Sequence, residues 1–243
     1  MKTKAALLAA MCLAPLSIGA QTSAVPTMDH EPHHHLALQN DFVKVFKVEV
    51  APGDSIILHS HDADTIAIAI GDQLVTVGIP GKPDVHQKNG DGQIRLQRGG
   101  YIHSTRVDGD TPYHTVAVEL LRPQTGYHNA CAEILPGQPL NCPLIDPKLP
   151  AVSGSEPLLE SNETRASLVR VLPHKSMKVG ESGSEVIVAL DAATISGTSN
   201  EPAKTLKPGD FVWLDGGAGQ LRGYKNSGAE DARFIEITFQ PAK

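Results

Sequence analysis

The sequence predicts an all-β protein, and three observations carry this prediction. Runs rich in Val, Ile and Thr recur along the 243 residues, whereas helical periodicity is hard to find. The 22 Gly and 18 Pro residues break these runs at short intervals, as the turns of a β protein do. Several runs alternate between apolar and polar residues, which is typical of strands with one buried face. With 40% hydrophobic residues, the chain can form one large β domain or two small ones.

Residues 1–24 have the pattern of a secretory signal peptide. Two lysines begin it, residues 5–14 form a short apolar run, and small residues follow, so cleavage after Ala20 or Ala24 is expected. The run is too short to cross a bilayer as a helix. We therefore expect an exported protein, periplasmic or secreted, with no membrane partner once the signal is removed. A net charge of -6 without a basic patch argues against nucleic acid as a partner.

Cys131 and Cys142 are the two cysteines that remain after the signal is removed. An even number in an exported chain favours a disulfide, which would stabilise the fold by about 2–3 kcal/mol on the chain-entropy account. The alternative is a pair of free thiols. Both cysteines lie in residues 123–161, which are rich in Pro, Gly and Asn and show no sustained period. This stretch is predicted to be a linker between residues 25–122 and residues 162–243.

Strand patterns recur on both sides of this linker. Residues 36–50 alternate between apolar and charged side chains, as strands with one buried face do. Further apolar runs lie at 56–58, 65–71, 73–79, 93–96 and 114–121, and then at 166–172, 185–190, 204–206, 211–214 and 234–239. Residues 80–92 are polar and rich in turn-forming residues, which predicts a surface loop with His86 as a solvated member.

His59 and His61 stand at the end of an apolar run. Side chains of residues i and i+2 of a strand point to the same face, so the two imidazoles can be aimed at one point. The apolar residues on both sides place this point inside a β structure. Such an arrangement is typical of a metal site, and a further ligand is expected elsewhere in the chain.

Residues 25–35 are polar and end in Glu31-Pro32-His33-His34-His35. Three interpretations remain open for this segment. It could be a loose arm that collects metal ions. It could begin a strand that has the first and third histidines on one face. It could also be a plain solvated N-terminal segment.

The residues around the histidine pair resemble the first motif of the cupin superfamily. Gly53 is followed after five residues by His59-x-His61, after two more by Asp64, and after six more by Gly71. The family pattern has Glu in place of Asp64, with three or four residues before it. This chain therefore departs from the motif in the identity of the acid and in one spacing.

A second stretch resembles the second cupin motif. Gly92 is followed after five residues by Arg98-x-Gly100 and after two more by His103. The family pattern has Pro where Arg98 stands and Asn where Val107 stands. All three histidines of the two motifs are nevertheless present at the family's spacing.

The resemblance implies a small jelly-roll β-barrel over residues 25–122, with a divalent metal ion bound inside by His59, His61 and His103. Imidazole ligands suit Fe(II), Cu, Mn, Ni and Zn; the ligand set alone does not choose, and Fe(II) is the first candidate. Asp64 would either reach the metal as a fourth ligand or accept a hydrogen bond from the far nitrogen of a ligand.

Residues 162–243 resemble a degenerate copy of the same barrel, which makes the expected architecture two tandem barrels. When Pro52 is aligned with Pro173, Glu185 falls on Asp64, and a second alignment places Gly209 on Gly92. The positions that correspond to the three histidines hold Gly180, Ser182 and Gln220. The single histidine of the copy, His174, is not at a ligand position. The second barrel is therefore expected to be structural.

Two functions of different classes fit these observations. The first is an exported metal-dependent enzyme, a mononuclear dioxygenase or an isomerase, that acts on a small organic substrate. Its candidate catalytic residues are Asp64, as a general base, together with Arg106 and His114, and Thr65 and Tyr101 are further polar groups near the site. The second is a non-enzymatic module that binds a small molecule or a metal. Cupins often pair through their sheets, so the resemblance allows a homodimer, but no residue indicates one.

Overall fold

The computed structural model describes residues 25–129, 133–135, 153–181, 183–197, 204–216 and 221–240. The predicted signal peptide and both cysteines lie outside these residues, so the export and disulfide predictions are not addressed. Apart from the short 3-10 helix η1, the regular secondary structure of the described residues is all β-strand, which confirms the predicted fold class. None of its helices has the length and the apolar character that crossing a membrane requires.

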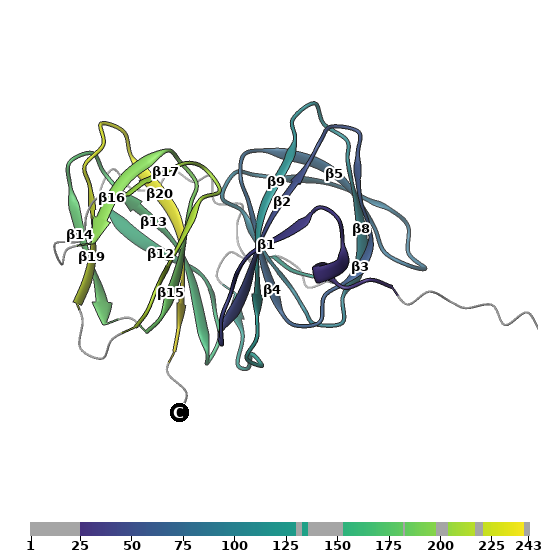
Figure 1. Cartoon of the computed structure of the whole chain (residues 1–243), viewed down its shortest axis with the longest axis horizontal. Helices are drawn as coiled ribbons and strands as arrows, with labels where there is room; N and C mark the ends of the chain where they lie inside the picture. Colours follow the sequence, from purple (N-terminus) through teal and green to yellow (C-terminus); the bar gives the residue numbers. More distant parts are fainter. Residues whose placement is uncertain are drawn as a thin grey trace, which may run out of the picture.

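The first unit consists of two sheets that face each other, on the right of Figure 1. Its six-stranded sheet has the order β1 (His34–Gln39), β2 (Val43–Val50), β9 (Tyr113–Leu120), β4 (Thr65–Ala69), β7 (Ile94–Gln97) and β11 (Glu133–Leu135). Its four-stranded sheet has the order β3 (Ser55–Ser60), β8 (Ile102–Val107), β5 (Gln73–Gly78) and β6 (Val85–Asn89).

The second unit repeats this arrangement, on the left of Figure 1. Its six-stranded sheet has the order β10 (His128–Asn129), β12 (Gly154–Glu160), β13 (Thr164–Val171), β20 (Ala232–Phe239), β15 (Glu185–Ala189) and β18 (Phe211–Leu214). Its four-stranded sheet has the order β14 (Ser176–Glu181), β19 (Leu221–Asn226), β16 (Ala193–Gly197) and β17 (Lys204–Leu206). The order β2-β9-β4-β7 thus returns as β13-β20-β15-β18, with strands of the same lengths.

Several stretches differ from the sequence prediction. Strands β8, β14, β16 and β19 lie where no strand was predicted. Residues 80–92, predicted to be a loop, contain β6, which pairs with β5 over five residues. The pattern is hard to detect because β6 is an edge strand with mostly exposed, polar side chains. His86 is exposed as predicted, but it lies in this strand, and its Nδ1 is 2.7 Å from Thr76 Oγ1. Residues 123–161, predicted to be a linker, contribute β10, β11 and β12.

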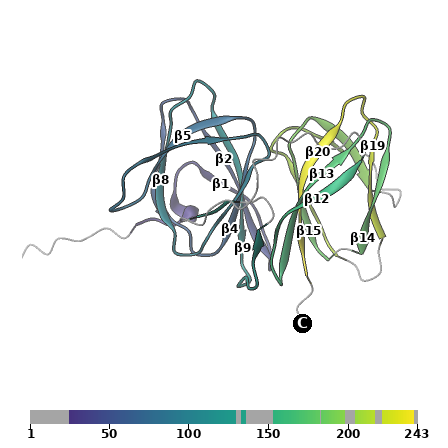
Figure 2. The same ribbon diagram turned by 180° about the vertical axis from the view of Figure 1, so that it is seen from behind.

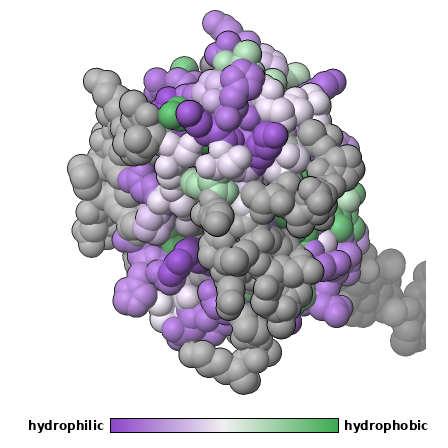
Figure 3. Space-filling model, turned by 90° about the vertical axis from the view of Figure 1, so that its left-hand side faces the viewer, coloured by the Kyte–Doolittle hydropathy of each residue, from purple (hydrophilic) through white to green (hydrophobic). Residues whose placement is uncertain are grey.

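The two six-stranded sheets pack against each other, as the opposite views of Figures 1 and 2 show. Alternation along β2 makes this possible, because each of its two faces carries buried apolar residues. Val43 and Val45 join the cluster between the units, whereas Phe46 and Val48 point into the first unit. Figure 3 looks at the far end of the second unit, from the side of β14 and β19, where the described surface is mainly hydrophilic.

The contact between the units depends on two glycines in equivalent turns. Gly92 has φ +74° and lies so close to the second unit that an added Cβ would be 2.7 Å from Leu190 Cδ1. Gly209 has φ +81°, and an added Cβ would overlap the ring of His114 in the first unit. Both turns therefore need a residue without a side chain, for conformation and for space.

The N-terminal segment covers the mouth of the first unit. Its 3-10 helix η1 (Met28–His30), the purple coil in Figure 1, lies between the two sheets. Pro26 accepts a backbone hydrogen bond from Ser60 at 2.8 Å, and Asp29 forms an ion pair with Lys44 at 2.6 Å. Met28 is only 1% exposed and belongs to the inner core. This segment is therefore part of the fold, and its solvated interpretation is wrong.

Candidate metal centre

A bulge in β3 aims His59 into the first unit. Strict alternation from the buried Ile56 would point His59 outward, but the register against β8 shifts between these two residues. Ile57 and Leu58 both face solvent, at 48% and 38% exposure, and His59 returns to the inside with no exposed surface. His59 then lies directly opposite His103 in the ladder.

The motif glycine Gly100 brings the third element into place. Its φ of +82° is a left-handed conformation that glycine adopts without steric cost. Its amide donates to the carbonyl of His61 at 2.7 Å, and the amide of His61 donates to the carbonyl of Tyr101 at 2.9 Å. These two bonds hold His61 beside the start of β8, which carries His103.

The three motif histidines come together as the sequence predicts. Nitrogen atoms of His59, His61 and His103 all lie within 4.8 Å of one another, and all three side chains are buried. Their ring centroids are 4.6–5.1 Å apart. The shared face of His59 and His61 is therefore confirmed, although His61 lies just past the end of β3.

Each ring uses Nδ1 to hold its orientation. His59 Nδ1 donates to the carbonyl of Ile57 at 2.9 Å. His61 Nδ1 is 3.2 Å from Thr65 Oγ1, and His103 Nδ1 is 3.4 Å from Thr105 Oγ1. This is the support that metal-binding histidines usually have, because fixing one nitrogen orients the other.

The remaining nitrogens are suited to a cation. His59 Nε2 is buried without a hydrogen-bond partner. His61 Nε2 and His103 Nε2 face each other at 3.0 Å, where two lone pairs repel unless a proton or a cation lies between them. Burying such groups is costly, and a metal ion offsets this cost. The donor set therefore fits the divalent metal that the cupin motifs imply.

The electrostatics keep these rings neutral. Burial lowers the pKa of His59 to about 4 and that of His61 to about 3, and neighbouring imidazoles act in the same direction. The pKa of His103 is also well below its ordinary value, chiefly because of burial. Imidazole binds a metal only in its neutral form, so the three rings are ready ligands at neutral pH.

Asp64, the acid of the first motif, points elsewhere. Its carboxylate accepts hydrogen bonds from Arg98 Nε at 3.1 Å, from the amide of Gly99 at 2.8 Å and from the hydroxyl of Tyr127. It does not belong to the group of ligand atoms within 4.8 Å. Asp64 thus ties the end of the first motif to the turn of the second, next to the histidines.

The other two predicted catalytic residues lie on outward faces. Arg106 alternates with the inward-facing His103 on β8, is 55% exposed and bonds Asp108 at 2.9 Å. His114 stands at the start of β9 on the side of the second unit, against Gly209 and 3.6 Å from Glu49. The structure brings neither residue to the three histidines. Of the further polar groups expected nearby, Thr65 contacts His61, and the Tyr101 ring stacks on His103 at 4.8 Å.

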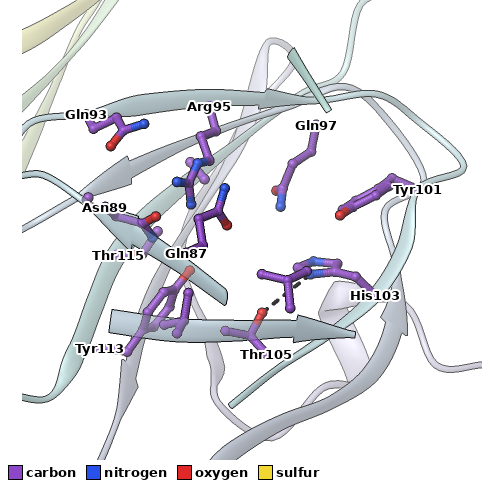
Figure 4. A pocket seen from close by; sticks show the side chains of 14 residues that line it. Gln87, Asn89, Gln93, Arg95, Gln97, Tyr101, His103, Thr105, Tyr113 and Thr115 are labelled. Carbon is purple, nitrogen blue, oxygen red and sulfur yellow. Dashed lines mark hydrogen bonds between the residues drawn. The ribbon is translucent and has the colours of Figure 1, made fainter. Parts of the chain in front are cut away.

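A cavity of about 30 Å³ lies beside His103 inside the first unit. Figure 4 shows His103 and Tyr101 at one end of it and Tyr113 at the other, with Arg95 and Gln97 directed toward its middle. Most of the residues that line it carry polar groups, unlike those of an ordinary protein core. This volume holds about two water molecules.

The sequence interpretation missed two residues near the site. His34 begins β1 with its side chain only 5% exposed, and its ring centroid is 4.8 Å from that of His59. Glu31 is fully buried and 2.7 Å from His34 Nδ1. His34, the middle one of the three consecutive histidines, is therefore the one that points inward. The sequence signal for this pair was Glu31, an acid that stands three residues before His34 in a histidine-rich segment.

Two facing sheets with histidines at both motifs define a protein of cupin fold, and comparison with solved structures agrees. AerE from Microcystis aeruginosa is 12% identical, with a TM-score of 0.56 over 87% of this chain and 99% of that one. A cupin 2 conserved barrel domain protein from Leptotrichia buccalis is 8% identical, with a TM-score of 0.54 over 85% and 88% of the two chains.

A salicylate 1,2-dioxygenase from Pseudaminobacter salicylatoxidans is 10% identical, with a TM-score of 0.56 over 84% of this chain and 75% of that one. No protein-family model and no curated protein matches the sequence. At these identities the likeness shows the fold alone. The chain therefore has the cupin fold, and its site carries a histidine cluster that could hold a divalent metal.

Proposed function

We propose that the protein is a metal-dependent enzyme of oxygenase type that acts on a small organic substrate. One observation carries the proposal: three buried, neutral imidazoles place ligand nitrogens within 4.8 Å of one another beside a cavity lined mostly by polar residues. Such a centre leaves coordination positions for other molecules, because three ligands do not fill the sphere of a transition metal.

His59, His61 and His103 would hold the metal, for which Fe(II) is the first candidate. Such a metal can bind substrate and dioxygen together and can polarise an oxygen atom of the substrate. The chain supplies the surroundings. Tyr101 covers one face of the His103 ring, and the buried Met28 of the N-terminal segment contacts Thr65, which in turn contacts His61. Polar groups of the cavity, such as Gln97, can orient a substrate by hydrogen bonds.

Hydroxylated aromatic acids are the first substrates to test. A salicylate 1,2-dioxygenase structure that contains gentisate is 12% identical to this chain, with a TM-score of 0.54. The shared fold does not carry over the activity, but the compounds offer a defined starting set. Catechols and flavonols extend it to other oxygenated rings.

The second candidate is a non-enzymatic module that binds a metal or a small ligand. The size of the cavity favours it, because about 30 Å³ is far below the roughly 300–1,000 Å³ of typical ligand pockets. An enzyme would have to open this space when its substrate binds, whereas a metal-binding module would not.

Metal analysis of the purified full chain separates these functions. The enzyme hypothesis expects stoichiometric iron, or another redox metal, and oxygen consumption with one of the test compounds. Stoichiometric metal without any turnover would favour the binding module. A folded protein that takes up no metal would contradict both the enzyme and the metal-binding module.

We also propose export to the periplasm or the medium, on the strength of residues 1–24. Expression of the full chain in a bacterial host, followed by fractionation and mass measurement, tests this. The expected product lacks the first 20 or 24 residues and is found outside the cytoplasm. A cytoplasmic protein that keeps these residues would contradict the proposal.

A further inference from the structure

Four histidines of the first unit, and not three, combine a buried side chain with one hydrogen-bond pattern. In His59, His61 and His103 the Nδ1 atom contacts a protein oxygen, which leaves Nε2 for another partner. His34 repeats the pattern, because its Nδ1 is bound by Glu31 Oε2 at 2.7 Å. A carboxylate on the far nitrogen is a frequent support of metal-binding histidines, since it fixes the ring and raises its basicity.

The backbone places His34 on the inner face of the first unit. It is the first residue of β1 and lies opposite Val48 of β2, whose side chain belongs to the inner core. Its ring centroid is 4.8 Å from that of His59, within the 4.6–5.1 Å range found among the three motif histidines. The edge of Phe46, with centroids 6.1 Å apart, supports it from the other side.

Glu31 connects this histidine to the bulge that aims His59. One carboxylate oxygen accepts from the amide of Ile57, the bulge residue, at 3.2 Å, and the other is bound to His34 Nδ1. The Glu31 carboxylate thus connects the two elements that carry His34 and His59.

The acid of the first motif, Asp64, does not supply a fourth ligand to the three histidines. The resemblance implies an acid beside the three histidines, but Asp64 is bound to Arg98, Gly99 and Tyr127. Among the described residues, His34 is the histidine that stands next to the cluster, with its Nε2 not engaged by Glu31.

We propose that His34, held by Glu31, is the fourth nitrogen ligand of the metal centre, supplied from outside the two motifs. The proposal rests on the metal centre of the proposed function. The nitrogens of His34 lie outside the set whose members are all within 4.8 Å of one another, so binding draws its ring toward the others. The N-terminal segment that covers the site thereby becomes part of it.

Copper-loaded protein tests this directly, since pulsed electron paramagnetic resonance counts the imidazoles bound to Cu(II). The unsubstituted chain is expected to show four coordinated imidazoles and His34→Gln three. The affinity for Cu(II) should fall by more than about 100-fold in this variant, because removing a ligand costs more than the 10- to 100-fold that a supporting group contributes. The matched control is His35→Gln: His35 is the exposed next residue, opposite Lys47 on the outward face, and should change neither quantity.

A count of three imidazoles in the unsubstituted chain, or an unchanged count in His34→Gln, would overturn the inference while the three-histidine centre stands. Protein that binds no Cu(II) at all would overturn both. Because His34→Gln could disturb folding, Glu31→Gln provides a second variant that keeps His34. It should lower the affinity by a smaller factor, and circular dichroism of the metal-free protein checks that the fold is retained. An unchanged affinity in folded Glu31→Gln would contradict the role given to the Glu31–His34 pair.

Discussion

The two units differ most in what fills them. Their strands correspond in order and length, yet the first encloses histidines, Arg95 and several amides, whereas the second encloses an apolar cluster around Tyr224 and Phe234. The second unit also buries two acids, Glu185 and Glu236, and Tyr224 donates to Glu236 at 2.6 Å. One fold thus carries two kinds of interior.

The comparison shows which parts of the motifs serve the fold and which serve a site. Gly92 and Gly209 are kept in both units, with φ of +74° and +81°, because each permits close contact with the opposite unit. The ligand positions are not kept. At the turn before β14, His174 adopts the left-handed conformation, φ 56°, that Gly53 adopts before β3. The glycines are thus retained in both units because packing requires them. The positions of the three histidines hold other residues in the second unit, because packing does not require imidazoles there.

The largest effect is expected when one of the motif histidines, which only the first unit has, is removed. His103→Ala should lower the affinity for Fe(II) or Co(II) by more than about 100-fold, because it removes a ligand and not merely the support of one. Isothermal titration calorimetry measures this affinity. The control is His174→Gly in the second unit, which keeps the left-handed backbone and should bind metal like the unsubstituted chain. Equal loss in both variants would place the metal outside the motif histidines.

The contact between the units provides the second test. Gly209→Ala should destabilise the protein by about 3 kcal/mol, from the left-handed backbone, about 1–2 kcal/mol, and overlap with the His114 ring. Gly53→Ala has nearly the same φ, +79°, but open space around the added Cβ, so it should cost only the backbone part. Urea denaturation of both variants gives the difference. Equal destabilisation would mean that the units do not hold each other as closely as the contact indicates.

Much of the fold follows from the sequence, for identifiable reasons. Strands such as β2 and β20 are buried, and their side chains carry the pattern that predicts them. Strands such as β6 and β14 form no such pattern, because β6 is a polar edge strand and β14 contains few apolar residues. β6 pairs with β5, the strand just before it, but its exposed polar side chains give no apolar pattern. β14 pairs with β19, a strand distant in sequence, which local patterns do not reveal.

The sequence predicted the part of the site that belongs to the two short motifs. His59, His61 and His103 follow the motif spacing and meet as expected. The contribution of the N-terminal segment was not predictable, since Glu31 meets Ile57 through a bulge that no pattern in β3 announces. The direction of Asp64 was equally hidden, because it depends on Tyr127, a residue far along the chain.

The two interiors should respond to pH in opposite directions. In the metal-free protein the lowered pKa of His59 contributes stability that is present above pH 6.5 and lost as the pH falls through about 4. Burial raises the pKa of Glu236 to about 7, so its contribution is present below pH 4.5 and lost as the pH rises through about 7. Between these values the two trends partly cancel.

The variant Glu236→Gln should separate these two pH trends, because it removes the contribution of the second unit. This variant should be about 3 kcal/mol more stable than the unsubstituted protein at pH 8 and nearly equal to it at pH 4.5, because Gln imitates the protonated acid. Urea denaturation of the metal-free proteins at both pH values measures the difference. A variant that gains no stability at pH 8 would mean that Glu236 is ionised at ordinary cost in the second unit.

The smallest expected effect concerns Asp64, the acid that the motif would make a ligand. Asp64→Asn keeps an oxygen for the amide of Gly99 but weakens the bonds from Arg98 and Tyr127, so it should cost about 1 kcal/mol of folding stability. Metal affinity should change by less than about threefold, well short of the 10- to 100-fold that even a supporting group contributes. Calorimetric titration beside a thermal melt separates the two readouts. A loss of affinity as large as that of His103→Ala would mean that Asp64 turns inward to bind the metal, and that the first unit has the histidine and acid site its motif resembles.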